Sequence, residues 1–368
     1  MQWFLQNLIY GVQLGSLYAL IALGYTMVYG VLRLINFAHG DVYMVGAYVG
    51  YYACAHLLPF ADLQAHPEAG LANIGLAAVV LVLAMCTCAI LGVLIERFAY
   101  RPLRNGLKHA DAHFWGCVLA LPVAAHFGGL ATAGGLGAFA AAAIAFGFGL
   151  RPVVVWMAAR IKLSSSRLNA LITAIGVSLI LENGGVLVFG ANPSFIGNVV
   201  PERTVRLPGG VQIGTSQLAI LLVSLLLMAG LRYIVLYTRR GKAMRAISHD
   251  IEAAKLMGID TDRVISFTFA LGAALAGAGG AMVAMLMHFK ITPLFGLQPG
   301  LKAFVAAVLG GAGNIPGAAV GGIIMGIAET FVSATYSSYT DAIAFCILTL
   351  ILLFRPAGIL GKNVAEKV

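Results

Sequence analysis

The sequence predicts an all-α polytopic membrane protein, a bundle of roughly eight or nine core transmembrane helices. Three observations lead to this fold class. Of the 368 residues, 60% are hydrophobic and only 10% are charged, whereas a soluble domain carries about 25% charged residues. The mean hydropathy is +0.93, and apolar segments run from one end of the chain to the other. We therefore expect lipid, not water, to surround most of the protein.

The expected membrane helices follow one another with short polar breaks between them. A helix needs about 20 apolar residues to cross a hydrocarbon core of ~30 Å. A single transmembrane domain over residues 1–368 is predicted, rather than two or three soluble domains. Runs of the required length lie near 8–30, 39–58, 71–94, 169–189, 216–236 and 265–287.

The positions of the basic residues predict the orientation. Most Lys and Arg residues fall in short polar stretches between or after the apolar runs. Such clusters lie in the cytoplasm under the positive-inside rule, which puts the N-terminus outside and the C-terminus inside. Only Arg203 and Arg206 oppose this assignment. The same distribution explains the net charge of +9 without a nucleic-acid partner.

The chain between 288 and the last helix requires a bent element. A short apolar run near 300–309 precedes the glycine-rich turn 310–317, and a longer helix is expected near 318–335. Ten helical residues span only ~15 Å. A re-entrant half-helix that enters the membrane, turns and returns as a full helix fits this pattern, and such broken helices often line a transport cavity.

The longest inner loop, residues 238–264, has the features of a docking element. It holds Glu252, Ala253 and Ala254, followed by Gly258. The acidic residue suits the start of a short helix and the glycine suits its end. Glu-Ala-Ala-x-x-x-Gly in a long inner loop resembles the coupling loop of ABC importer permeases, where cytoplasmic ATPases bind. The alternative is an ordinary solvated helix.

Polar residues inside expected membrane helices are candidates for function. Asn36, His39 and Asp41 lie where two helices meet on the inner side, and Glu329 lies near the outer end of a helix. These four residues are candidates for a translocation path. The sequence leaves other roles open: the first three could satisfy backbone groups freed between helices, and Glu329 could lie at the membrane interface.

Several classes of protein are excluded by missing motifs. The sequence contains no Gly-x-x-x-x-Gly-Lys-Ser/Thr phosphate-binding loop, so no ATP site of that type is expected. It also lacks a Ser/His/Asp set, paired carboxylates and a metal cluster with workable spacing. We expect neither catalysis by this chain nor a cofactor or metal.

Five motifs together resemble the H-type permease subunit of branched-chain amino acid ABC importers. The first contains the run Asn36-Phe37-Ala38-His39-Gly40. The resemblance covers about 8–104 and 164–368, and the motifs lie at 24–48, 96–104, 257–265, 301–311 and 356–361.

The resemblance implies a subunit of the bacterial inner membrane that has no ATPase site of its own. Its partners would be a second, homologous permease in a heterodimer, two cytoplasmic ATP-binding subunits and a periplasmic amino-acid-binding protein. The imported molecules would be leucine, isoleucine and valine. A permease for urea or short-chain amides is the closest alternative, because such proteins share the Asn-x-Ala-His-Gly run. An ion-coupled secondary transporter would need a buried acidic residue or a sodium site, together with inverted repeats.

One segment departs from the family pattern. Residues 105–163 separate two motifs that normally follow each other directly, and they are apolar and rich in Gly and Ala. An insertion into an inner loop keeps the downstream topology only if it crosses the membrane an even number of times. A two-helix hairpin near 114–129 and 134–150 is therefore expected.

Overall fold

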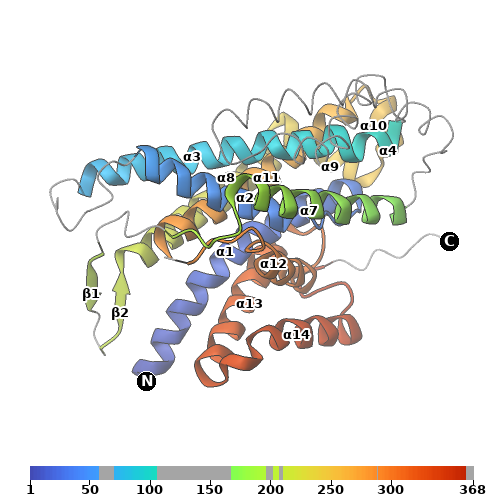
Figure 1. Ribbon diagram of the computed structural model, residues 1–368. Coiled ribbons are helices and arrows are strands. Elements are labelled where there is room, and N and C mark those ends of the chain that lie inside the picture. Colours follow the sequence, from blue (N-terminus) through green and yellow to red (C-terminus); the bar gives the residue numbers. More distant parts are fainter. Residues whose placement is uncertain (58–69, 106–166, 196–201, 207–209, 288, 362–368) are drawn as a thin grey trace. The chain divides into compact units, whose positions relative to one another are not determined.

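The computed structural model describes residues 1–57, 70–105, 167–195, 202–206, 210–287 and 289–361 (Figure 1). The chain divides into two units, Met1–Val93 with Ser178–Val368, and Leu94–Val177. The expected hairpin at 105–163 lies almost entirely outside the described residues and stays a prediction.

The first unit is built around the long helix α1 (Gln2–Leu32), which is buried from Leu17 to Val28. It packs against α11 (Thr261–Leu286) and α13 (Ile315–Thr335). A Cβ atom at Gly15 would lie 2.7 Å from the Cα atom of Ile323, and one at Gly322 would lie 2.5 Å from that of Ala19. The backbones of α1 and α13 are therefore as close as two helices can be, and any side chain larger than hydrogen would separate them.

Helix α2 (His39–Leu57) packs on α11 in the same way. A Cβ atom at Gly46 would lie 2.5 Å from the Cα atom of Gly277. The Gly/Ala run of α11 is almost completely buried. Lipid gives apolar helices no hydrophobic reason to associate, so close contact between small residues is what holds this core together.

A short helix, α12 (Leu297–Gly310), turns directly into α13. The turn is covered by the C-terminal tail, because the Ile359 N–H donates to the Leu309 carbonyl at 2.8 Å and the Leu360 N–H donates to the Gly310 carbonyl at 3.2 Å. The amide of Asn314 donates in turn to the Leu360 carbonyl at 2.6 Å. The expected sequence of short helix, glycine turn and long helix is confirmed, while its re-entrant path through a membrane stays a prediction.

The remaining helices expose apolar side chains, as lipid-facing helices do. Helix α8 (Thr215–Tyr237) exposes Leu222, Leu225 and Leu226. A small antiparallel pair of strands precedes α8. The other elements are α3 (Gly70–Ile95), α7 (Arg167–Phe189), β1 (Thr204–Arg206), β2 (Gln212–Gly214), η3 (Ser337–Tyr339) and α14 (Thr340–Phe354).

The motif at 96–104 forms a π-helix, η2 (Glu96–Tyr100), followed by α4 (Arg101–Asn105). Glu96 is fully buried, accepts a hydrogen bond from Arg104 and forms an ion pair with it. This contact lies within the second unit. The motif therefore provides its own counter-ion for a buried carboxylate, which would otherwise be costly.

The predicted fold class is confirmed. Each of the six expected long runs corresponds to a helix whose ends differ from the expected ones by a few residues. Among the described residues, seven helices are long and apolar enough to cross a membrane, with α12 as a shorter apolar helix. The total number of spans, the single domain and the orientation of the termini stay predictions.

The glycine contacts lead to a stability prediction. Gly46→Ala is expected to destabilise the protein by about 1–3 kcal/mol, because the added methyl group forces α2 away from α11. Gly230→Ala in α8 is the matched control, since no atom lies within 4 Å of the position of its Cβ. It is expected to be neutral or to stabilise by up to about 1 kcal/mol through helix propensity. Thermal unfolding in detergent micelles measures both, and equal shifts of the midpoint would contradict the packing argument.

Candidate functional site

The loop 238–264 folds into two helices, α9 (Arg239–His249) and α10 (Ile251–Leu256). Thr238 caps α9 by accepting a hydrogen bond from the Gly241 N–H at 3.1 Å. Gly241 fits directly against the carbonyl groups of Ile234 and Val235 at the end of α8, where no side chain would fit. The Arg240 guanidinium lies 4.8 Å from the centre of the Phe267 ring on α11. The loop is therefore fixed to both helices that carry it.

Helix α10 has well-defined caps at both ends. The Asp250 side chain accepts hydrogen bonds from the N–H groups of Glu252 and Ala253. At the other end Gly258 has φ +80°, and the Ile259 N–H donates to the Ala254 carbonyl at 3.1 Å. This Schellman arrangement needs a left-handed residue, which glycine adopts without strain. The expected acidic start and glycine end of the helix are confirmed.

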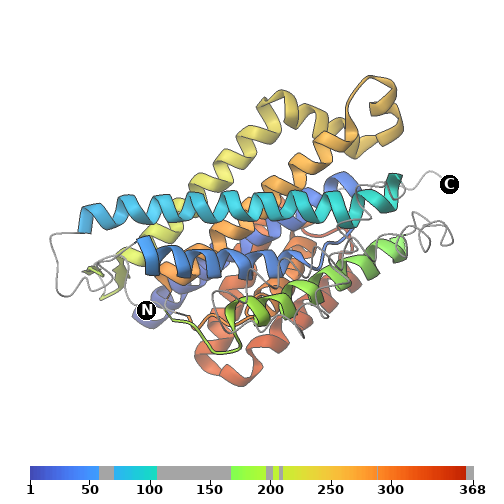
Figure 2. The same ribbon diagram turned by 45° about the horizontal axis from the view of Figure 1, so that its top comes forward.

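The predicted docking residues divide between two faces of α10. Ala254 is buried against the rest of the loop, whereas Glu252, Ala253 and Gly258 face outward. The structure adds two apolar residues that sequence reasoning did not select, since Leu256 is 89% exposed and Met257 is 82% exposed. Figure 2 shows α9 and α10 as a projecting tip at the far end of α8 and α11. These two exposed apolar side chains at the tip are candidates for a contact with a partner.

The Asn36, His39 and Asp41 group lies buried where α1 passes into α2. The Nε2–Cε1 edge of the His39 ring lies directly against Gly24, and the ring meets that of Tyr25 edge-on with the centroids 4.8 Å apart. Asp41, in the first turn of α2, accepts a hydrogen bond from the Ser178 hydroxyl. Asn36 accepts a hydrogen bond from the His39 N–H through its backbone carbonyl. These contacts are typical of residues that hold a helix junction together.

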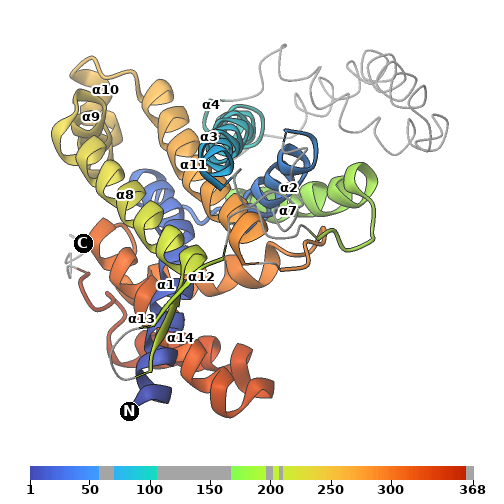
Figure 3. The same cartoon turned by 90° about the vertical axis from the view of Figure 1, so that its left-hand side faces the viewer.

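A cavity of about 540 Å³ opens between α1, α11, α12 and α13, and Glu329 is the candidate residue that lines it. Asn36, His39 and Asp41 are absent from the described residues around it. The cavity is lined by Val283 and Met287 at the C-terminal end of α11. Helices α9 and α10 lie at the N-terminal end of α11 (Figure 3). The described lining of the cavity consists of Asn7, Leu14, Leu17, Tyr18, Tyr43, Val283, Met287, Phe289, Leu294, Phe295, Gln298, Pro299, Glu329, Thr330, Ser333 and Ala334.

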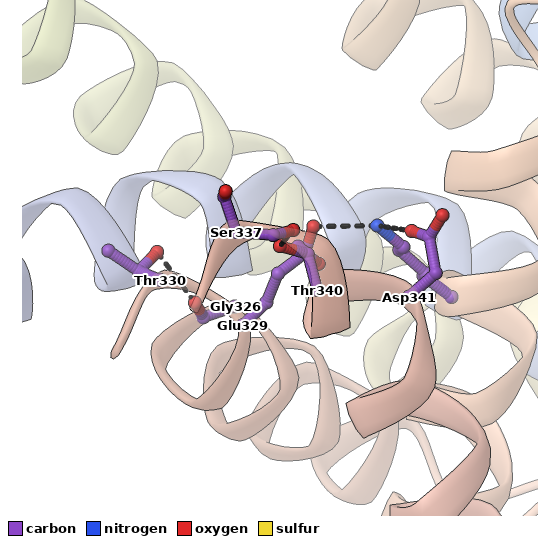
Figure 4. Close-up of polar contacts among 7 residues, drawn as sticks. Gly326, Glu329, Thr330, Ser337, Thr340 and Asp341 are labelled. Carbon is purple, nitrogen blue, oxygen red and sulfur yellow. Dashed lines mark hydrogen bonds and ion pairs between the residues drawn. The ribbon is translucent and has the colours of Figure 1, made fainter. Parts of the chain in front are cut away.

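Glu329, which lines this cavity, forms a group of three charged residues with Lys302 and Asp341 (Figure 4). Lys302 of α12 donates to the Glu329 carboxylate of α13 at 2.7 Å and to the Asp341 carboxylate of α14 at 2.8 Å. The side chains of Lys302 and Glu329 are less than a tenth exposed, whereas that of Asp341 is about half exposed. Two acids thus share one buried base.

Sequence reasoning missed Lys302 and Asp341. Lys302 lies in the short, otherwise apolar run near 300–309, and Asp341 lies at the start of the last helix. One signal could have identified them. Charged residues are rare in membrane segments, and those that occur there are usually paired with an opposite charge. Among the described residues, no group of three His, Cys, Asp or Glu side chains could hold a metal ion.

Comparison with known proteins gives matches along the whole chain. Residues 7–352 match the family described as branched-chain amino acid transport system / permease component. The chain is 38% identical to the high-affinity branched-chain amino acid transport system permease protein LivH of Escherichia coli (strain K12), over 100% of this chain and 98% of the relative. It is 36% identical to the corresponding protein BraD of Pseudomonas aeruginosa, over 99% and 98%. No solved structure matches the chain.

The shared base leads to a second stability prediction. Lys302→Met is expected to destabilise the protein by roughly 3–5 kcal/mol, because Glu329 is left as an unpaired buried charge. The double variant Lys302→Met with Glu329→Met is expected to recover most of this loss, since it buries two apolar side chains of similar length. Chemical denaturation in detergent, followed by circular dichroism, measures both. A double variant as unstable as the single one would contradict this account.

Proposed function

Because the chain belongs to the family of branched-chain amino acid transport permeases, we propose that it is the membrane subunit of an ATP-driven importer for leucine, isoleucine and valine. The observation that carries this proposal is similarity along the full length to relatives named as high-affinity permeases for these amino acids. The chain is a multi-pass membrane protein, and its relatives are transport subunits rather than enzymes.

ATP hydrolysis is assigned to partner subunits that dock on the loop 238–264. The projecting tip supports this assignment: Leu256 and Met257 offer an apolar contact, and exposed Glu252 beside them offers a charge. Buried Ala254, by contrast, keeps α10 attached to the rest of the loop. A push on α10 passes directly into α8 and α11, because Gly241 and Arg240 hold α9 tightly against them.

Alternating access follows from the separation of the two sites. Helix α11 has 26 residues and is about 39 Å long, with the docking tip near its first turn and the cavity near its last. With the tip in the cytoplasm, the cavity opens toward the outside, where a periplasmic binding protein delivers the amino acid. The N-terminus is then outside and the C-terminus cytoplasmic. Movement of α8 and α11 by the ATPases closes the cavity and opens it inward.

The assembly we propose contains two permeases, two ATP-binding subunits and the binding protein. The second permease is a homologue of this chain, which makes the membrane part a heterodimer. The exposed apolar faces of α7, α8 and α14 contact lipid or this second permease. An ion-coupled transporter would require a buried acid, and this chain has two, Asp41 and Glu329. Each already has a partner in the protein: Ser178 donates to Asp41, and Lys302 pairs with Glu329.

Reconstitution of the complete transporter tests the proposed substrate. The neighbouring operon products are purified with this chain and placed in nanodiscs, and ATP hydrolysis is measured with binding protein loaded with leucine, with urea or with nothing. Leucine is expected to stimulate hydrolysis several-fold over the empty binding protein, and urea is expected to have no effect. Stimulation by urea alone would replace the amino acid assignment with that of a urea or amide permease.

Substitution at the tip of the loop tests the coupling role. Leu256→Asp is expected to reduce leucine uptake into proteoliposomes at least about tenfold, because a charge replaces an apolar contact with the ATPase. Stability should not change, since the side chain is almost fully exposed. Val205→Asp is the matched control, as Val205 is also exposed but lies before α8, at its other end. Normal uptake in the Leu256 variant, or labelling of an introduced Ala253→Cys from outside the cell, would refute the assignment.

A further inference from the structure

The cavity beside α13 combines an apolar wall with one charged group. Leu14, Leu17, Val283, Met287 and Leu294 contribute branched or flexible apolar side chains. Tyr18, Gln298 and Thr330 add uncharged polar groups, and Glu329 is the charged residue among the described residues of the lining. A volume of about 540 Å³ lies within the range of pockets that hold small molecules, roughly 300–1,000 Å³.

The Glu329 carboxylate interacts with Lys302 and with the Tyr18 hydroxyl but keeps one oxygen without a hydrogen-bond partner among the described residues. Its Oε1 atom accepts from Lys302, whereas Oε2 is buried and has no hydrogen-bond partner among the described residues. Lys302 also serves Asp341, so one positive charge faces two negative charges. A buried carboxylate oxygen without a partner is costly, and this cost is removed when a cationic donor enters the cavity.

We propose that this cavity is a binding site for the transported amino acid in the membrane, with Glu329 Oε2 accepting hydrogen bonds from its ammonium group and the apolar wall holding its branched side chain. This inference rests on the proposed function and adds the contacts that recognise the substrate. Lys302 is a positioning residue, because it fixes the Glu329 carboxylate through Oε1 and leaves Oε2 directed to the ligand.

The chemistry of the lining favours this occupant over other small molecules. Hydrogen bonds between an ammonium group and a carboxylate are about twice as strong as neutral ones. The described lining offers no cation for the carboxylate of the amino acid, which is left to an uncharged donor such as the Gln298 amide. The Thr330 hydroxyl already donates to the Gly326 carbonyl at 2.9 Å. The site is therefore expected to require the amine and the branched chain but to tolerate loss of the carboxylate.

Protection from chemical labelling tests this site on the complete transporter, without ATP or binding protein. Ser333 lines the cavity and is exposed, so Ser333→Cys, in a chain whose five native cysteines are replaced by alanine, reports on occupancy. Leucine and 3-methylbutylamine are expected to slow its reaction with a maleimide. The amine-free 4-methylpentanoate and the chain-free ethanolamine are expected to protect at least about tenfold less well. Equal protection by either of these two overturns the proposal, as does the absence of any protection by leucine.

Two variants separate recognition from structural support. Glu329→Gln should raise the leucine concentration needed for half protection about tenfold or more. The double variant Lys302→Met with Glu329→Met leaves neither Lys302 nor Glu329 as an unpaired buried charge. It should raise the leucine concentration needed for half protection by the same factor. Glu182→Gln is the matched control, because it removes a carboxylate from α7 outside the cavity lining. It should change the leucine concentration needed for half protection less than about twofold. A double variant that regains wild-type protection would show a purely structural pair and overturn the proposal.

The outcomes for the site and for the proposed function can be told apart. Leucine-stimulated hydrolysis by the wild-type transporter, with labelling that leucine does not slow, would leave the function intact and remove the site. Amine protection without leucine-stimulated hydrolysis would keep an amine site in the cavity and overturn the transport assignment.

Discussion

The structure depends on the close approach of helix backbones in a solvent that gives apolar helices no reason to associate. At the contact of α2 with α11, Gly46 lies directly on Gly277, and at that of α1 with α13, Gly322 lies on Ala19. Dispersion between closely packed atoms replaces the hydrophobic effect as the attractive force. Because these contacts tolerate no added methyl group, the positions of α1, α2, α11 and α13 relative to one another are tightly defined within their unit.

This tight packing has a consequence for the charged residues beside it. Lys302 and Glu329 come from the helices on either side of the turn between α12 and α13, and the Cβ position of Gly310 meets the carbonyl of Gly317 at that turn. The two helices are held so closely that the ion pair has a fixed geometry. The attraction within a buried ion pair offsets the cost of desolvation only when its geometry is good. The glycine packing is thus the condition that allows a buried carboxylate to border the cavity.

The sequence predicted the features that depend on local pattern. The apolar runs locate the helices, and Glu252 and Gly258 mark the ends of α10, because hydropathy and helix caps act over a few residues. The sequence could not predict features that depend on contacts between distant segments. Lys302 finds Glu329 27 residues away, and Asp41 finds Ser178 137 residues away, so neither pairing leaves a local signal. The exposure of Leu256 and Met257 likewise follows from the direction in which the tip projects.

The described contacts of the polar residues in the first motif join helices, while a place for these residues in the translocation path stays a prediction. Asn36, His39 and Asp41 are buried, and their described contacts join α1, α2 and α7. A polar side chain at a break between membrane helices satisfies groups that the helices leave free, and this requirement is the same whatever molecule is carried. Both His39 Nε2 and Glu329 Oε2 are buried without a hydrogen-bond partner among the described residues. Glu329 differs because it borders open space, whereas His39 Nε2 lies directly against Gly24. Contact with open space, rather than a missing hydrogen-bond partner alone, thus distinguishes the Glu329 carboxylate from the buried polar groups at the helix junction.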